Sequence, residues 1–194
     1  TVVIVHPIPE ASTNKPPDQC FGLPVTFNSL STVENNNTII NHDWNFNYPS
    51  ISVPISGQNP PEKIFPDTGQ HIIQLTVETN NNCLSSILDT VFIYPNPDID
   101  FGQDSISTCV NSYLLRAPQN CTNFWSNGTT ADSLIVNYSG DFFLQSTNLN
   151  ECTSRETINI ELNSIFSPSI ESFFKISSAL PPLSLLIFGK IGFE

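Results

Sequence analysis

The sequence is built from short segments in which apolar and polar side chains alternate, each bounded by Asn, Gly or Pro. In residues 71–77, Ile73, Leu75 and Val77 point to one face and the residues between them to the other, as in a strand with one buried face. An Asp-Thr-Gly turn precedes this segment and three asparagines follow it. Strands are predicted over residues 25–27, 39–46, 51–55, 71–79, 86–94, 113–115, 124–125, 133–136, 141–147 and 157–162. Short strands with frequent turns indicate an all-β chain of sandwiches rather than an α/β fold.

A weak internal repeat divides the chain. The strand and Pro-x-Pro sequence at Thr1–Pro9 resembles Thr90–Pro97, and the offset of 89 positions between Thr1 and Thr90 also separates Cys20 from Cys109. A third echo is the Thr-Ile-Asn-Ile sequence at residues 157–160. We therefore expect the last strand of a preceding repeat over residues 1–6, a first unit over 7–97, a second over 98–162 and an incomplete β segment over 163–194.

The charge balance excludes two classes of partner. Six Lys and Arg against 18 Asp and Glu give a formal net charge of −12. Nucleic acid and anionic membrane surfaces both attract basic proteins, so neither is an expected partner. The sequence contains no apolar run long enough for a membrane span and begins with no signal-peptide pattern. Because it also contains no Met, we expect a processed product or an excerpt of a longer chain.

The five cysteines indicate disulfides rather than zinc. No Cys-x-x-Cys occurs, and no cysteine has a histidine at zinc-finger spacing. A low-charge β protein with small cores is the kind that disulfides stabilise in an oxidising compartment. Sequence spacing alone does not choose among the ways of forming two bonds from five cysteines.

Two stretches resemble known extracellular modules. Residues 20–93 resemble a PKD domain, an immunoglobulin-like sandwich of bacterial surface proteins, through Val25-Thr26-Phe27, Trp44-Asn45-Phe46, Phe65-Pro66-Asp67-Thr68-Gly69 and Leu75-Thr76-Val77. The family usually has Trp-Asp-Phe-Gly-Asp where this chain has Trp-Asn-Phe-Asn-Tyr, which removes two acidic positions. Residues 109–152 resemble a small Ig-like repeat of secreted gliding-bacterium proteins through Trp125-Ser126-Asn127-Gly128, Gly140-Asp141-Phe142 and Asn150-Glu151-Cys152.

The tail carries a third resemblance. Ile165-Phe166-Ser167-Pro168, Phe173-Phe174-Lys175-Ile176 and Leu185-Leu186-Ile187-Phe188 are similar to parts of the gliding-motility-associated C-terminal domain, a sorting signal of type IX secretion. The family's Asn-Gly-Asp-Gly-rich loop is absent. This resemblance implies an extracellular or bacterial cell-surface location, with components of the secretion machinery as partners of the tail.

The resemblances also imply a cysteine pairing. In both families a cysteine near the start of the domain bonds one in the last hairpin, which implies Cys20–Cys83 and Cys109–Cys152. Cys121 is then the odd thiol, either free or bonded to another molecule. The two tryptophans, Trp44 and Trp125, occupy positions that fill the cores of such sandwiches.

No catalytic pattern emerges, so we expect no enzyme activity. His6, His42 and His71 belong to no nucleophile, metalloprotease or phosphate-binding motif. Asp98, Asp100 and Asp104 could share a calcium ion, although three acids in such a stretch more often form a solvated linker. No other cofactor is expected. Thr90, Ser105 and Ser133 lie in Asp-Ser/Thr-aliphatic sequences, which by resemblance are O-glycosylation sites of the same bacterial group.

The functional hypothesis is a non-enzymatic extracellular stalk or adhesin module whose neighbours are other repeats of the same protein. One alternative is a glycan-binding or spacer region of a secreted polysaccharide-degrading enzyme. Another is a subunit of an extracellular filament, joined to further copies of itself by strand exchange at an exposed sheet edge.

Overall fold

The described part of the chain is made of β-strands alone. The structure, a computed structural model, describes residues 5–34, 36–50 and 52–163, and those residues contain no helix and so none that could cross a bilayer. The predicted all-β fold is therefore confirmed. The expected tail segment over residues 163–194 lies outside the described residues except for Asn163, and the strand expected at the start lies outside them over residues 1–4.

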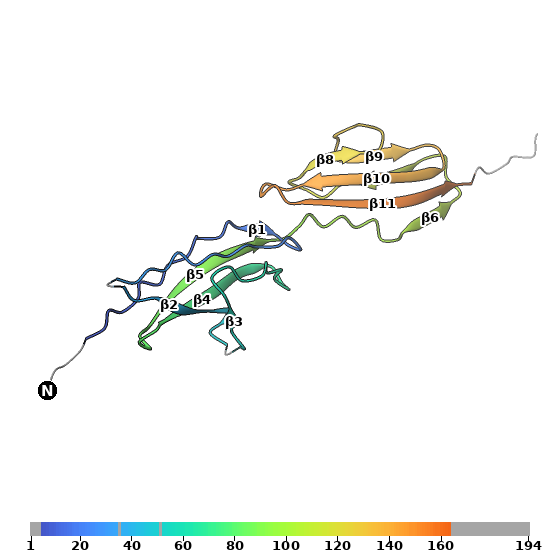
Figure 1. The fold of residues 1–194 in the computed structure, drawn as a ribbon. Coiled ribbons are helices and arrows are strands. Elements are labelled where there is room, and N and C mark those ends of the chain that lie inside the picture. The colour runs from blue at the N-terminus through green and yellow to red at the C-terminus, as the bar shows by residue number, and fades with distance from the viewer. Residues whose placement is uncertain (1–4, 35, 51, 164–194) are drawn as a thin grey trace, which may run out of the picture.

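The first domain, which we define by strands β1–β5, contains one five-stranded sheet (Figure 1). The sheet order is β1-β5-β4-β2-β3, with β1 parallel to β5 and the other neighbours antiparallel. The strands are β1 (Gln19–Cys20), β2 (Ile39–Tyr48), β3 (Ile55–Ser56), β4 (Gly69–Thr79) and β5 (Leu84–Tyr94).

The second domain, defined by strands β6–β11, has a four-stranded sheet in the order β6-β11-β10-β8 and a two-stranded sheet of β7 and β9. Here the edge strand β6 is parallel to β11, just as β1 is parallel to β5 in the first domain. The strands are β6 (Ser105–Thr108), β7 (Tyr113–Arg116), β8 (Thr122–Trp125), β9 (Ser133–Val136), β10 (Gly140–Thr147) and β11 (Thr153–Leu162). The unit limits at residues 6, 97 and 162 stay predictions.

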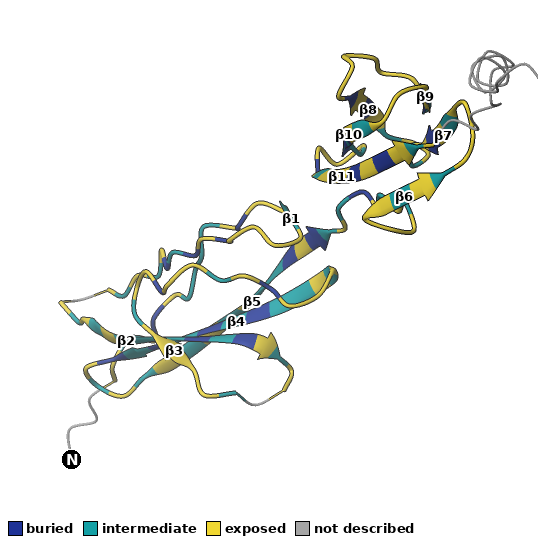
Figure 2. Ribbon diagram, turned by 90° about the vertical axis from the view of Figure 1, so that its right-hand side faces the viewer, coloured by how far each residue is buried: buried dark blue, intermediate teal, exposed yellow. Residues whose placement is uncertain are grey.

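Each domain has its own hydrophobic core, built on a tryptophan. Trp44 is 1% exposed in the first core and Trp125 is 0% exposed in the second, which confirms the core positions predicted for both rings. Along β4, Ile73, Leu75 and Val77 are buried while the residues between them are partly exposed. The same alternation is visible as dark and light bands on β5 and β11 (Figure 2).

One predicted strand is reduced to a single bridge. Val25 and Phe27 are buried in the first core, but the backbone of this segment pairs with the chain only where Val25 and Lys63 exchange two hydrogen bonds of 2.9 Å. Pro24 adjoins one partner, and two prolines lie close before the other. Because proline has no N–H to donate, the ladder does not extend. The strand predicted over residues 51–55 is likewise limited to β3, with residue 51 outside the described residues.

Candidate functional site

The two domains are joined by a disulfide as well as by the chain between them. Cys20 in β1 is bonded to Cys152 in the hairpin between β10 and β11, with the Cα atoms 5.4 Å apart and 132 positions between them in the sequence. In Figure 1 this hairpin of the second domain lies next to the end of β1 and β5. The domains are therefore arranged end to end, and this junction is the most distinctive site of the described chain.

A local network around Asn148 shapes the hairpin that carries Cys152. The Asn148 backbone N–H donates to the Cys152 carbonyl (2.9 Å), and the Asn148 side-chain Oδ1 accepts from the N–H groups of Cys152 (3.1 Å) and Asn150 (3.0 Å). Glu151 adopts a left-handed conformation with φ of 63°. The Asn148 carbonyl also accepts the Glu151 N–H at 3.1 Å, so this one asparagine satisfies four backbone groups of the turn.

The same asparagine also contacts the first domain. Its Nδ2 donates a hydrogen bond of 2.8 Å to the carbonyl of Pro95, immediately after β5. The next residue, Asn96, donates from Nδ2 to the carbonyl of Phe21 at 3.1 Å, which ties the start of the connecting segment to the loop after β1. The junction therefore combines one covalent bond with hydrogen bonds on both sides of it.

The cysteine pairing implied by the resemblances is wrong. Cys83 precedes β5, whereas Cys20 pairs with Tyr94 at the other end of the same strand. At roughly 3.3 Å per residue, the 11 residues of β5 place these cysteines about 35 Å apart, far beyond disulfide reach. Cys152 and Cys109 are separated in the same way by the length of β11. Cys152 directly precedes β11, whereas Cys109 directly follows β6, which pairs with the other end of β11.

Three thiols consequently stay unpaired within the chain. Cys83 and Cys121 are half-buried and Cys109 is exposed. Cys121, the residue predicted to be odd, lines a shallow hollow with Asn148 and Leu149 near the junction. Whether it bonds to another molecule stays a prediction.

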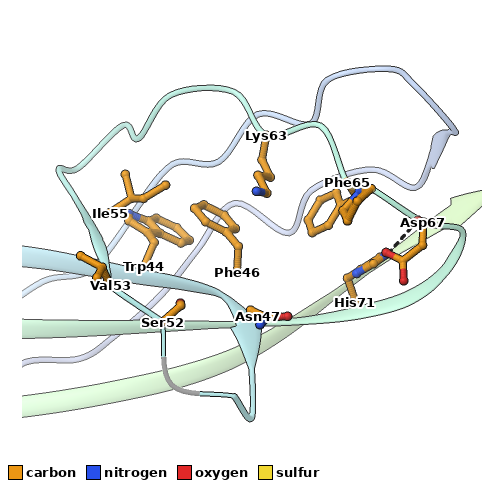
Figure 3. A pocket seen from close by; sticks show the side chains of 11 residues that line it. Trp44, Phe46, Asn47, Ser52, Val53, Ile55, Lys63, Phe65, Asp67 and His71 are labelled. Atoms are coloured by element: carbon orange, nitrogen blue, oxygen red, sulfur yellow. Dashed lines mark hydrogen bonds and ion pairs between the residues drawn. The ribbon is translucent and has the colours of Figure 1, made fainter.

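A hollow of about 450 Å³ on the first domain is the main candidate for a ligand site (Figure 3). Its floor is formed by the rings of Trp44, Phe46 and Phe65, which are almost wholly buried. The Trp44 ring is stacked on Phe46 at 6.1 Å between centroids, and its Nε1 donates to the Gly57 carbonyl at 2.9 Å. These rings pack against one another rather than offering an open platform for a sugar.

The polar side chains that line this hollow are those of Asn47, Ser52, Lys63, Asp67 and His71. His71 Nε2 lies 3.0 Å from the Asp67 carbonyl and 3.6 Å from an oxygen of its carboxylate, while Lys63 projects from the opposite side (Figure 3). Val53 on the rim is 90% exposed. Ser52 also lines the hollow, and its hydroxyl donates to Asn45 Oδ1 at 2.7 Å.

A serine–histidine contact that sequence reasoning missed lies elsewhere in the first domain. His42 Nδ1 is 2.9 Å from Ser29 Oγ, and burial lowers the pKa of His42 below its ordinary value of 6.5, an effect partly opposed by Asp43. Ser29 is 0% exposed and is also hydrogen bonded to Ser31 at 2.9 Å. The Ser29 hydroxyl is therefore shielded from solvent in this structure.

The structure does not bring the three predicted calcium ligands together. Among the described residues, no group of three His, Cys, Asp or Glu side chains could hold a metal ion. Asp100 Oδ1 instead accepts the Gly102 N–H at 2.6 Å and so closes a local turn, while the Asp104 carbonyl accepts from the Asn159 N–H. Asp98 takes no part in either contact.

The predicted O-glycosylation residues lie on strands. Ser105 is exposed at the start of β6, whereas Thr90 in β5 and Ser133 in β9 are half-buried. Their modification stays a prediction.

Comparisons with known proteins give weak likenesses to PKD, fibronectin(III)-like and Ig domains. The chain is similar to the PKD1 domain of Epp from Vibrio anguillarum (19% identity, 47% of this chain and 96% of that one, TM-score 0.35) and to fibronectin(III)-like modules of CbhA from Clostridium thermocellum (6%, 81% and 95%, TM-score 0.37). It is also similar to the IG1 and IG2 domains of DIP-gamma (10%, 81% and 98%, TM-score 0.42). No family model matches the sequence, and no curated protein matches it. Identities and TM-scores this low carry no argument about activity, ligand or partner.

Proposed function

We propose that this chain is a non-enzymatic extracellular stalk module, which holds a fixed spacing between what lies on either side of it. The observation that carries the proposal is the Cys20–Cys152 disulfide, which joins the two domains at a second point besides the connecting segment. Structural disulfides persist in oxidising surroundings such as the cell exterior, which supports an extracellular location. The formal net charge of −12 favours solubility there.

The disulfide changes how the chain responds to pulling. A force applied at the two ends passes from residues before Cys20 directly through the sulfur atoms to residues after Cys152. The intervening chain, which includes β2 to β10, carries no extension even if it unfolds. Only the segment before Cys20 and the segment after Cys152 can be drawn out, and β11 in the latter is held by ladders to both β10 and β6.

The double connection also predicts that the domains tumble together. In the oxidised protein, backbone ¹⁵N relaxation of β4 and of β10 should give one common rotational correlation time. In C20S/C152S the two strands should give shorter and different values, because only the connecting segment then joins the domains. Independent tumbling in the oxidised protein would contradict the stalk proposal.

The glycan-binding alternative gains no support from the hollow on the first domain. Its aromatic rings are buried and pack against one another, whereas stacking with a sugar needs an aromatic ring whose face is exposed to solvent. Affinity electrophoresis against soluble plant and algal polysaccharides should therefore show no retardation. Retardation that V53D removes, by altering the exposed rim of the hollow, would instead assign a glycan-binding role.

A further inference from the structure

The hairpins that carry Cys83 and Cys152 are built in the same way. In the first domain the Thr79 N–H donates to the Cys83 carbonyl (3.0 Å), and the Cys83 N–H donates to Thr79 Oγ1 (3.2 Å). In the second domain Asn148 makes the same two contacts with Cys152, at 2.9 and 3.1 Å. Each turn also has a residue in the left-handed region just before the cysteine, with φ of 58° at Asn82 and 63° at Glu151.

The cysteines at the other end of each domain are also equivalent. Cys20 ends β1, which runs parallel to the last strand of the first domain, and Cys109 directly follows β6, which runs parallel to the last strand of the second. An exposed apolar residue follows each cysteine: Phe21 is 41% exposed and Val110 is 42% exposed. Each domain thus presents a hairpin cysteine at one end and an edge-strand cysteine at the other.

The molecule already contains one bond between these two kinds of cysteine. The edge-strand Cys20 of the first domain is bonded to the hairpin Cys152 of the second, and the unused members of each kind are Cys109 and Cys83. These two thiols lie at opposite ends of the described molecule, since the β4–β5 hairpin is at the end where the chain begins and the ends of β6 and β11 are at the far end (Figure 1).

We propose that Cys109 of one copy forms a disulfide with Cys83 of a second copy, so that the junction seen within the chain is repeated between chains. The inference rests on the proposed stalk function and names its partner. Because the two surfaces differ, the contact is head-to-tail and does not close on itself, and repetition gives a linear array. Within such an array the shortest covalent path through each copy runs from Cys83 along β5 to β6 and Cys109, with β5 paired on both sides, and the Cys20–Cys152 bond closes a second, longer path.

The bond forms by thiol–disulfide exchange with a low-molecular-weight disulfide such as oxidised glutathione. The thiolate of Cys109 attacks one sulfur of that disulfide, which gives a mixed disulfide and releases one glutathione thiolate. The thiolate of Cys83 from the second copy then attacks the protein sulfur of the mixed disulfide and releases the second glutathione. Two protein thiols are oxidised, one small disulfide is reduced to two thiols, and the two protons go to solvent or to the released thiolates.

One difference between the junctions shapes the expected behaviour. Asn148 contributes an amide hydrogen bond to Pro95 across the internal junction, whereas its counterpart Thr79 is buried and has no amide to donate. The contact between copies therefore depends on the disulfide. We expect the reduced protein to be monomeric and the oxidised protein to form covalent chains.

The test uses full-length chains that lack the third thiol. In the C121S background, C83S keeps only Cys109 and C109S keeps only Cys83, with the internal disulfide intact in both. In a glutathione redox buffer, non-reducing electrophoresis should show a ladder for C121S, monomer for each double variant, and dimer without larger species when the two double variants are mixed. A monomeric mixture, or a double variant that dimerises alone as readily as the mixture does, would overturn the proposal.

A second measurement makes the test independent of how the variants fold. Wild-type protein grown on ¹⁴N and on ¹⁵N is mixed, oxidised and digested, and the expected disulfide-linked peptide joins Cys83 from one isotope to Cys109 from the other. Absence of that mixed peptide contradicts the proposal. A chain that tumbles as one body but forms no such peptide would refute this inference and leave the stalk function standing.

Discussion

Cys20 and Cys152 are bonded although 132 sequence positions separate them, and they belong to different domains with separate hydrophobic cores. The bond lies beside the connecting segment that follows Tyr94, so two covalent routes cross one junction. A hinge at this point would have to distort both routes at once. The geometry explains how two small sandwiches, each with a modest core, can act as one longer body.

Removal of this bond should destabilise the pair of domains. In the chain-entropy model a loop of this length stabilises the folded state by up to about 5 kcal/mol, less any strain. C20S/C152S should therefore unfold at clearly lower denaturant concentration than wild type, as followed by far-UV circular dichroism. C121S, which removes a thiol that is not bonded, is the matched control and should unfold close to wild type. Equal midpoints for all three proteins would contradict this prediction.

Substitutions of Asn148 should distinguish the stability contributed by its hydrogen bonds within the hairpin from that contributed by its hydrogen bond across the junction. N148D retains an oxygen that can accept from Cys152 and Asn150 but cannot donate to the Pro95 carbonyl, next to which its charge is unfavourable. Loss of one such hydrogen bond should cost about 1 kcal/mol. N148A loses all the side-chain contacts and should cost more. The comparison is made by urea unfolding, and an N148D midpoint below that of N148A would show that the assignment of roles is wrong.

The buried tryptophans should report on the domains separately. Trp125 Nε1 donates to the Ala131 carbonyl at 2.8 Å, so W125F leaves that carbonyl unpaired and a gap beside it, at a combined cost of about 2 to 4 kcal/mol. Since the chain has two tryptophans, fluorescence of W125F then comes from Trp44 alone. We expect this signal to unfold near the wild-type midpoint, after the early loss of second-domain structure seen by circular dichroism. Coincident early transitions would indicate that the cores unfold together.

His42 should make the first domain less stable in mild acid. Its pKa in the folded protein is lowered by burial, so the unfolded chain binds the proton more readily. The stability contributed by the neutral ring is complete above the unfolded pKa of about 6.5 and is lost as the pH falls below that value towards the folded pKa. H42Q should flatten this part of the stability profile, measured by urea unfolding between pH 7 and mildly acidic pH. An unchanged slope would exclude His42 as its source.

The long strands could be predicted from the sequence because their alternation is local. β4 has Ile73, Leu75 and Val77 at alternate positions with polar residues between them, and such a local pattern is enough to predict a half-buried strand without any tertiary information. β1 and β6 have two and four residues, and both are defined by parallel pairing to strands more than 50 positions away. No local pattern identifies such short edge strands.

The disulfide could not be predicted for a related reason. Cys20 lies near the start of the first domain and Cys83 lies in its last hairpin, as expected. In the fold, however, these two cysteines lie at opposite ends of β5. A bond between Cys20 and Cys152 depends on the end-to-end placement of the domains, and this placement is fixed by contacts such as Asn148 to Pro95 that leave no spacing pattern. The sequence pattern did not predict that β1 pairs in parallel with β5, and this pairing places Cys20 at the end of the domain next to Tyr94.

Single-molecule force extension tests the central claim most directly, because the claim is that the Cys20–Cys152 bond carries the load. The protein is pulled from its two ends with and without reductant, alongside C20S/C152S. Oxidised wild type should show no release of the 132-position segment, whereas the reduced protein and the variant should each gain roughly 450 Å of contour length. The same long extension in the oxidised wild type would contradict the account.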